Sequence, residues 1–284
     1  MGYQNKTVSN DTFEMIVGTF VNTTDSDQLL KDYAIKSLSG TRFSLGNMKF
    51  IFFGADGNPL LVKNDETLKT FCPEAYAAFG GEDSKTELSF GYYRTTGWFL
   101  ASDSGRTYPM DNYPIIPGRG FNVYVSGHED GVEITSSGEV SQSDFTVTVP
   151  NDTFQMIGNA MPTDCKLKDI TVESLSGTRF SLGNMKFIFF GADGNPLLVK
   201  NDETLKTFCP EAYAAFGGED SKTELSFGYY RTTGWFLASD SGRTYPMDDY
   251  PIAAMRGFNV YVSGHEDGVK VTIPSPLQDA EASK

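Results

Sequence analysis

The chain is an internal repeat, and this feature constrains its fold more than any other. Residues 37–132 align without gaps on residues 174–269, and the two stretches differ at only four positions: Asn112/Asp249, Ile116/Ala253, Pro117/Ala254 and Gly118/Met255. Residues 10–13 match 151–154 at a larger offset, so copy one carries extra residues before Ser37. A near-identical tandem repeat predicts two copies of one structural unit.

The length of 284 residues fits two domains, each large enough to bury a core of its own. The polar segment 136–144 is the best linker candidate. We therefore predict copy one over residues 1–140 and copy two over residues 141–284, the latter ending in a short polar tail. Such a duplication presents the same surface twice, which favours avidity or pseudo-symmetric assembly over a duplication with no further consequence.

Short alternating apolar runs between Gly-rich and Asn-rich turns predict a mainly β structure. In copy one the expected strands are 13–17, 41–45, 49–53, 60–63, 87–94, 97–100, 120–125 and 132–135. One short helical stretch is expected over 64–81, because Pro73 and the glycines at 80 and 81 match the usual start and end of a helix. The sequence thus predicts two tandem β-sandwich domains, jelly-roll-like or barrel-like, each with one short helix.

The formal net charge of −14 argues against nucleic acid and anionic lipid surfaces as partners, since phosphate groups repel such a chain. No stretch approaches the ~20 apolar residues of a membrane-spanning helix, so membrane insertion is not expected. The first residues carry no apolar run, and no signal peptide is predicted.

Three short motifs carry a family resemblance. They are Met-Ile-Gly-Asn-Ala-Met-Pro at 156–162, Gly-Trp-Phe-Leu at 97–100, and Ile-Ile-Pro-Gly-Arg-Gly-Phe-Asn-Val-Tyr at 115–124. In this order they resemble β-sandwich repeat modules ("IGNP…PGQGF"-type) of secreted and surface proteins in Bacteroidetes- and Verrucomicrobia-like bacteria. Copy one departs from the opening motif at 16–19, and copy two departs from the Pro-Gly motif at 253–255. The resemblance implies an extracellular or cell-surface location and a structural or adhesive role, and it implies no catalytic residues.

Residues with reactive side chains are few. His128 and His265 lie in identical Gly-His-Glu-Asp-Gly segments, where a solvated turn is expected. Cys72 and Cys209 precede a helix start, which lowers a thiol pKa, yet a small buried residue is the stronger interpretation. With Cys165 the cysteines are odd in number, which does not predict a disulfide framework.

Catalytic motifs are absent from the sequence, and two histidines leave few groups for proton transfer at neutral pH. We therefore predict no enzyme activity and no cofactor. Calcium is the alternative cofactor, with oxygen ligands at 56–58, 82–83 and 103–104, although turn formation explains these residues equally well.

The function expected from these features is a non-catalytic, self-assembling structural protein of a bacterial surface layer, fibre or extracellular matrix. The alternative is a bivalent glycan-binding or adhesive module, in which the tryptophans would be partly exposed. Sheet edges and the variable segments 10–36 and 116–118, with their equivalents, are expected at the contacts. The candidate assembly or binding residues are Trp98, Trp235, Tyr93, Tyr230, Tyr113, Tyr250, Arg119, Arg256, Pro117 and Met255.

Overall fold

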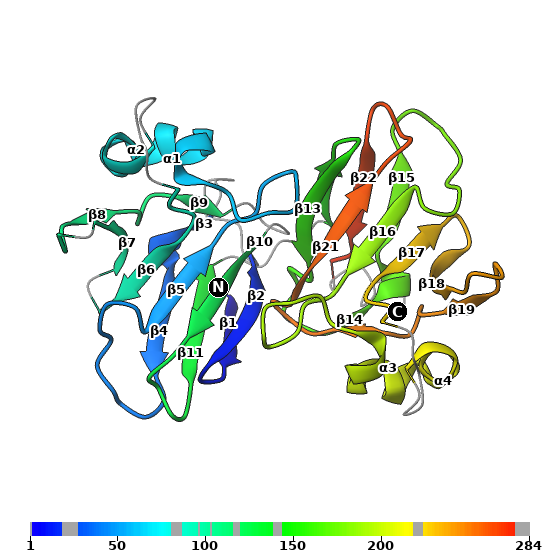
Figure 1. Ribbon diagram of the computed structural model, residues 1–284, viewed down its shortest axis with the longest axis horizontal. Coiled ribbons are helices and arrows are strands. Elements are labelled where there is room, and N and C mark those ends of the chain that lie inside the picture. The colour runs from blue at the N-terminus through cyan, green and yellow to red at the C-terminus, as the bar shows by residue number, and fades with distance from the viewer. Residues whose placement is uncertain are drawn as a thin grey trace.

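The chain forms two β-rich halves that lie side by side (Figure 1). The computed structural model describes residues 2–18, 28–80, 87–95, 97–102, 104–115, 120–138, 144–217 and 224–275. The prediction of a mainly β structure with two tandem sandwich domains is confirmed. The predicted junction at residues 140 and 141 and the polar tail beyond residue 275 lie outside the described residues.

Copy one packs a three-stranded sheet, order β1-β11-β4, against a six-stranded sheet, order β2-β10-β5-β6-β7-β8, and β3 pairs with β9. All of these pairings are antiparallel. Its elements are β1 (Gly2–Val8), β2 (Thr12–Val17), β3 (Gln28–Leu29), η1 (Leu30–Asp32), β4 (Tyr33–Ser37), β5 (Met48–Ile51), η2 (Val62–Asn64), α1 (Glu66–Phe71), α2 (Pro73–Phe79), β6 (Gly91–Arg94), β7 (Gly97–Ala101), β8 (Thr107–Pro109), β9 (Pro114–Ile115), β10 (Gly120–Val125) and β11 (Val132–Gly138).

Copy two repeats this topology, with sheets of order β12-β22-β15, β13-β21-β16-β17-β18-β19 and β14-β20. Its elements are β12 (Phe145–Val149), β13 (Thr153–Gly158), β14 (Cys165–Lys166), η3 (Leu167–Asp169), β15 (Thr171–Ser174), β16 (Met185–Ile188), η4 (Val199–Asn201), α3 (Glu203–Phe208), α4 (Pro210–Phe216), β17 (Gly228–Arg231), β18 (Gly234–Ala238), β19 (Thr244–Pro246), β20 (Pro251–Ile252), β21 (Gly257–Val262) and β22 (Val269–Ile273).

Aromatic rings fill the space between the sheets of each copy. Trp98 is 1% exposed, and its ring packs edge-on against Phe50 and Phe121 at centroid distances of 5.2 and 6.0 Å. Trp235 has the same surroundings in copy two and is also 1% exposed. Buried aromatic side chains of this size dominate the packing energy of a small sandwich.

The helical stretch is two short helices that meet at Cys72. The Asp65 carboxylate caps α1 by accepting a hydrogen bond from the Leu68 amide at 2.9 Å. Pro73 begins α2, at a position where a backbone N–H would have no acceptor within the helix. Gly80 is the C-cap. No helix in the described ranges is long and apolar enough to span a membrane.

Two predicted strands are wrong. Residues 41–45 form an irregular loop, because local hydroxyl contacts and a hydrogen bond from the Ser44 amide to Asn47 Oδ1 replace strand pairing. Residues 60–63 lead into the 3-10 turn η2. Pairing with the first arm ends at the Phe53–Pro59 bridge and the hydrogen bond from the Leu60 amide to the Phe52 carbonyl. Apolar residues alternate at 41–45 and dominate 60–63, which predicts strands. The Ser44 amide is instead satisfied by the nearby Asn47 side chain, and the Val62 amide donates to the Leu88 carbonyl.

Both copies have a cross-strand pair of opposite charges at the same place, but the positions of the acidic and basic residues are reversed. Glu133 on β11 lies opposite Lys36 on the edge strand β4, whereas Lys270 on β22 lies opposite Glu173 on β15 and forms an ion pair with it. Opposite charges facing each other across an antiparallel pair stabilise it modestly, and like charges destabilise it. The charge pairing is therefore kept although both residues differ.

The two copies meet through reciprocal contacts. The Phe13 amide on edge strand β2 donates to the Ala192 carbonyl at 2.8 Å, and the Phe154 amide on edge strand β13 donates to the Ala55 carbonyl at 2.7 Å. Each phenyl ring also covers a glycine of the opposite turn, Phe13 on Gly194 and Phe154 on Gly57. These matched contacts define an approximate two-fold relation. In Figure 1, α1 and α2 lie at the top of copy one while α3 and α4 lie at the bottom of copy two.

Met255 joins the apolar core of the other copy. Met255 belongs to copy two, yet it is fully buried in the apolar cluster of copy one, and its carbonyl accepts from the Val17 amide at 3.2 Å. It has φ +61°, a conformation that suits the Gly118 found at this position of copy one. Positions 253–255, where the repeats differ, thus lie at the contact between copies, while 116–118 are outside the described residues.

Candidate functional site

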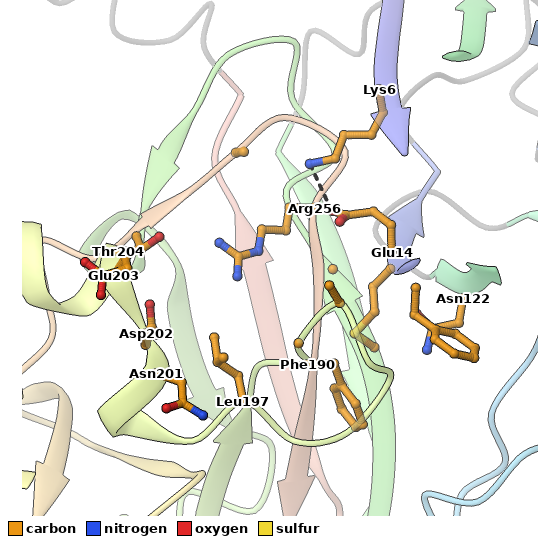
Figure 2. Close-up of a pocket in the computed structure, with 16 residues that line it drawn as sticks. Lys6, Glu14, Asn122, Phe190, Leu197, Asn201, Asp202, Glu203, Thr204 and Arg256 are labelled. Atoms are coloured by element: carbon orange, nitrogen blue, oxygen red, sulfur yellow. Dashed lines mark ion pairs between the residues drawn. The ribbon is translucent and has the colours of Figure 1, made fainter. Parts of the chain in front are cut away.

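The contact between the copies forms an open cavity of about 380 Å³ with one wall from each copy (Figure 2). Cavities of roughly 300–1,000 Å³ between domains are a common form of ligand site. Strands β1 and β2 supply the copy-one wall, and the turn at 190–192, the start of α3 and residues 253–257 supply the copy-two wall.

An ion pair forms the copy-one wall. Lys6 Nζ on β1 lies 2.9 Å from Glu14 Oε1 on β2, and the two side chains are 20% and 28% exposed. The β1–β2 hairpin brings the two residues together although they belong to different sheets. A partly buried pair of this kind holds its geometry better than an exposed one, and each group keeps hydrogen-bonding capacity toward the cavity.

Arg256 reaches into the cavity from the opposite wall (Figure 2). Its guanidinium lies over the rings of Phe189 and Tyr250, at 5.1 and 6.0 Å from their centroids. The Tyr250 hydroxyl donates to Asp202 Oδ2 at 2.9 Å, and Asp202 in turn caps α3 through the Leu205 amide. Burial raises the pKa of Tyr250 well above its ordinary value, so the phenol stays a hydrogen-bond donor at neutral pH. The arginine is therefore held in place by a fixed aromatic floor.

A second cavity of about 190 Å³ occupies the two-fold related position. Its lining includes Gln155 where the larger cavity has Glu14, and Val147 stands at the position of Lys6. The ion pair is therefore specific to one side of the molecule. Most other lining residues of the two cavities belong to the near-identical block, so this divergence makes the larger cavity the candidate functional site.

Sequence reasoning did not identify Lys6 or Glu14. Both residues lie before the near-identical block. In that earlier part of the chain the copies differ at too many positions for two of them to be singled out. The available signal is the loss of both charges together at Val147 and Gln155, which only the fold shows to be neighbours of one cavity.

The predicted tryptophan and tyrosine sites are core positions. The expectation that Trp98 and Trp235 would be partly exposed in a glycan site is wrong, because both indoles lie between the sheets. Each indole N–H donates a hydrogen bond to a backbone carbonyl near the start of an edge strand. Trp98 donates to Tyr33 O at 3.4 Å, and Trp235 donates to Ile170 O at 3.3 Å. Tyr93 and Tyr230 pack against these indoles at 5.1 and 4.9 Å. These four rings brace one sheet against the other.

The remaining predicted residues are divided among several places. Tyr113 is buried and donates to Asp65 Oδ2 at 3.0 Å, as Tyr250 does to Asp202. Arg256 and Met255 lie at the contact between copies, so the structure brings these two together with Tyr250. Pro117 and Arg119 lie outside the described residues.

The two histidines are buried, which corrects the expectation of a solvated turn. His128 is 0% exposed, its Nδ1 lies 2.8 Å from Ser37 Oγ, and its ring lies 4.3 Å from that of Phe43. Nε2 is buried without a hydrogen-bond partner among the described residues, and His265 repeats this arrangement. Burial lowers the pKa of both imidazoles, because the charged, protonated ring would lose its hydration in the core.

Acid is therefore expected to destabilise the fold through these histidines. Since the pKa is below 6.5 in the folded state, the unfolded chain binds more protons as the pH falls below 6.5, and stability is lost over that range. Thermal unfolding from pH 8 to about pH 5 should show a falling Tm for the native chain. The double variant His128→Gln, His265→Gln should show a flatter profile, and equal slopes would contradict this account.

The described cysteines and acidic turn residues are explained by burial and by turn formation. Cys72 and Cys209 are buried, which confirms the stronger of the two interpretations. Burial raises the pKa of both thiols to about 11 and that of Cys165 to about 12. Asp56 accepts from the amide and side chain of Asn58, as in an ordinary turn. No cluster of metal-ligating side chains occurs in the described ranges, and residues 82, 83 and 103 of the other calcium candidates lie outside them.

Comparison of the chain with protein-family models, curated proteins and solved structures finds no match.

Proposed function

We propose that the chain is a non-catalytic structural protein that self-associates, as a building unit of a bacterial surface layer, fibre or extracellular matrix. The resemblance to surface repeat modules supports the extracellular or cell-surface location. The fusion of two copies into one pseudo-two-fold body supports the structural role, because such a body presents every outer surface twice.

The observation that carries the proposal is the pairing of exposed apolar side chains. Large hydrophobic residues exposed by 42–50% occur at equivalent positions of both copies: Leu38, Leu45 and Phe71 in copy one, and Leu175, Leu182 and Phe208 in copy two. Single exposed apolar residues are normal on a soluble protein. Repeated on two sides of one body, they give each molecule two equal sets of contacts, which is what linear assembly requires.

Strand addition at the edges of the six-stranded sheets is a less suitable mode of assembly. The edges β2 and β13 are occupied by the contact between copies. The edge strands β8 and β19 are three residues long and end in Pro109 and Pro246, which cannot donate to a neighbouring strand. The three-stranded sheets also have edge strands, namely β1, β4, β12 and β15. We assign the proposed contacts to surface side chains because exposed apolar residues recur at equivalent positions of both copies.

Light scattering and electron microscopy over a range of concentrations test the proposal. The native chain should form filaments, tubes or sheets at high concentration. The double variant Phe71→Ser, Phe208→Ser should associate less while keeping its Tm, because both rings are about half exposed and contribute little to the fold. A native chain that stays monomeric at high concentration, with and without Ca²⁺, contradicts the proposed function.

A second candidate function is glycan binding in the larger cavity between the copies. It is favoured by the combination of Arg256 on its aromatic floor with the Lys6–Glu14 pair, since sugars need both hydrogen-bonding groups and apolar surface. Calorimetric titration with neutral and acidic monosaccharides tests it. Arg256→Gln should weaken binding, and Arg106→Gln, an exposed arginine that does not line the cavity, should not. Binding that is absent, or equal in both variants, contradicts it.

A further inference from the structure

We infer that self-association is head to tail: the arginine-bearing loop at one end of a copy binds the helical face at the opposite end of a copy in a second molecule. This inference rests on the proposed function and names the surfaces that perform it. The loop surface consists of Arg42, Ser44, Leu45, Arg94 and Thr95, and it is called the arginine surface below.

The arginine surface is a depression of about 500 Å³ with two cationic side chains and no acidic residue in its lining. No ion pair of Arg42 or Arg94 occurs within the described part of the chain. Arg94 lies over the Phe99 ring at 4.8 Å, and its Nε is buried without a hydrogen-bond partner there. In a chain of net charge −14, two such guanidinium groups form a local site for carboxylates.

The loop that carries this surface is fixed before any partner binds. Phe43 anchors it by packing against Tyr93 at 5.2 Å and His128 at 4.3 Å. The Ser44 amide donates to Asn47 Oδ1, and the Asn47 carbonyl accepts from the Ser126 amide. With Phe43 turned inward, Leu45 is left 50% exposed beside the arginines. A preorganised loop loses little conformational entropy on binding, which favours a role as a docking element.

The helical face supplies the complementary groups. Phe71 is 49% exposed at the end of α1, and Glu74 is exposed one residue after Pro73 at the start of α2. Ala77 and Ala78 continue this face with small apolar side chains. A carboxylate beside exposed apolar side chains matches the pair of arginines beside Leu45 in both charge and polarity.

The arrangement of the two copies favours repetition of this contact. In copy one the helices α1 and α2 lie at the top and the loop between β4 and β5 at the bottom, and copy two has the reverse arrangement (Figure 1). Each end of the molecule therefore presents one helical face and one arginine surface, with Arg179, Leu182, Arg231, Phe208 and Glu211 as the copy-two equivalents. A contact between unlike surfaces forms a ring where its rotation closes and a filament where it does not, and in this inference it extends into a fibre.

Charge reversal in two separate variants tests this pairing. The first variant is Arg42→Glu with Arg179→Glu, and the second is Glu74→Arg with Glu211→Arg. Each alone should fail to associate, because like charges then face each other. An equimolar mixture should associate again, because the acidic loops of the first match the basic helices of the second. The control Arg106→Glu with Arg243→Glu changes the net charge equally at exposed positions and should associate as the native chain does.

The outcomes distinguish this inference from the proposed structural function on which it rests. Native association that both variants retain overturns the pairing and leaves the structural function standing. A native chain that never associates overturns the function itself. Binding of a polyanion such as alginate to native monomers, lost in Arg42→Glu with Arg179→Glu, also overturns the inference, because the arginine surface then serves a glycan and not a second copy.

Discussion

Trp98→Ala is expected to destabilise copy one by about 3–5 kcal/mol, the usual cost of removing a large aromatic side chain from a packed core. Trp98 is 1% exposed and joins the rings of Phe50, Tyr93 and Phe121 between the sheets. Trp235→Ala should affect copy two by a similar amount. Unfolding in denaturant, followed by circular dichroism, measures the loss of stability.

The two copies provide an internal reference for this experiment. Each variant keeps one tryptophan, so its fluorescence follows the unaltered copy while circular dichroism follows both. Phe71→Ala is the matched control, because this exposed ring should change stability by about 0.5 kcal/mol or less. Unchanged stability in the tryptophan variants, with loss of assembly or ligand binding, would place the indoles at a surface and contradict the described core.

Gly57→Ala with Gly194→Ala is expected to open the contact between the copies while each copy stays folded. A Cβ at Gly57 would lie 2.9 Å from Phe154 Cγ, and one at Gly194 would lie 2.9 Å from Phe13 Cδ2. Overpacking of this kind costs about 1–3 kcal/mol at each site. The left-handed backbone at both glycines (φ +77°) adds strain of about 1–2 kcal/mol each.

Gly40→Ala with Gly177→Ala separates these two effects. Gly40 and Gly177 have nearly the same backbone conformation, φ +72° and +71°, but no neighbouring atom lies within 4 Å of an added Cβ. Small-angle scattering should show a larger radius of gyration for the Gly57 and Gly194 variant alone. Equal behaviour of the two pairs would mean that backbone strain, and not the phenyl contact, determines the result.

The sequence predicts local structure where a residue type has a strong backbone preference. Pro73 and Gly80 mark the ends of α2, and the glycine-rich turn at 54–59 lies where expected. The strand prediction fails at 41–45, where the Ser44 amide bonds to the nearby Asn47 side chain. It also fails at 60–63, where the chain turns into η2 and the Val62 amide bonds to the Leu88 carbonyl. Periodicity describes the side chains, and it does not show where each amide finds its partner.

The site was less accessible from the sequence because it depends on the packing of two copies. Met255 differs from Gly118 in the repeat alignment, but only the fold shows that it enters the core of the other copy. The aromatic residues do not reveal their exposure, since a residue such as Trp98, which is buried here, is equally suited to a core and to a binding surface. The polar segment around His128 predicts a solvated turn, but the imidazole ring folds back onto Phe43 and is buried.

The exchange of two backbone amides with solvent tests the central claim, that the copies form one unit through reciprocal contacts. Phe13 and Phe154 lie on edge strands, and their amides have partners only in the opposite copy, Ala192 O and Ala55 O. Hydrogen exchange followed by NMR on the intact chain should show both amides protected to a similar degree. Exchange of both at the rate of an open strand edge would contradict the fused unit on which the proposed function depends.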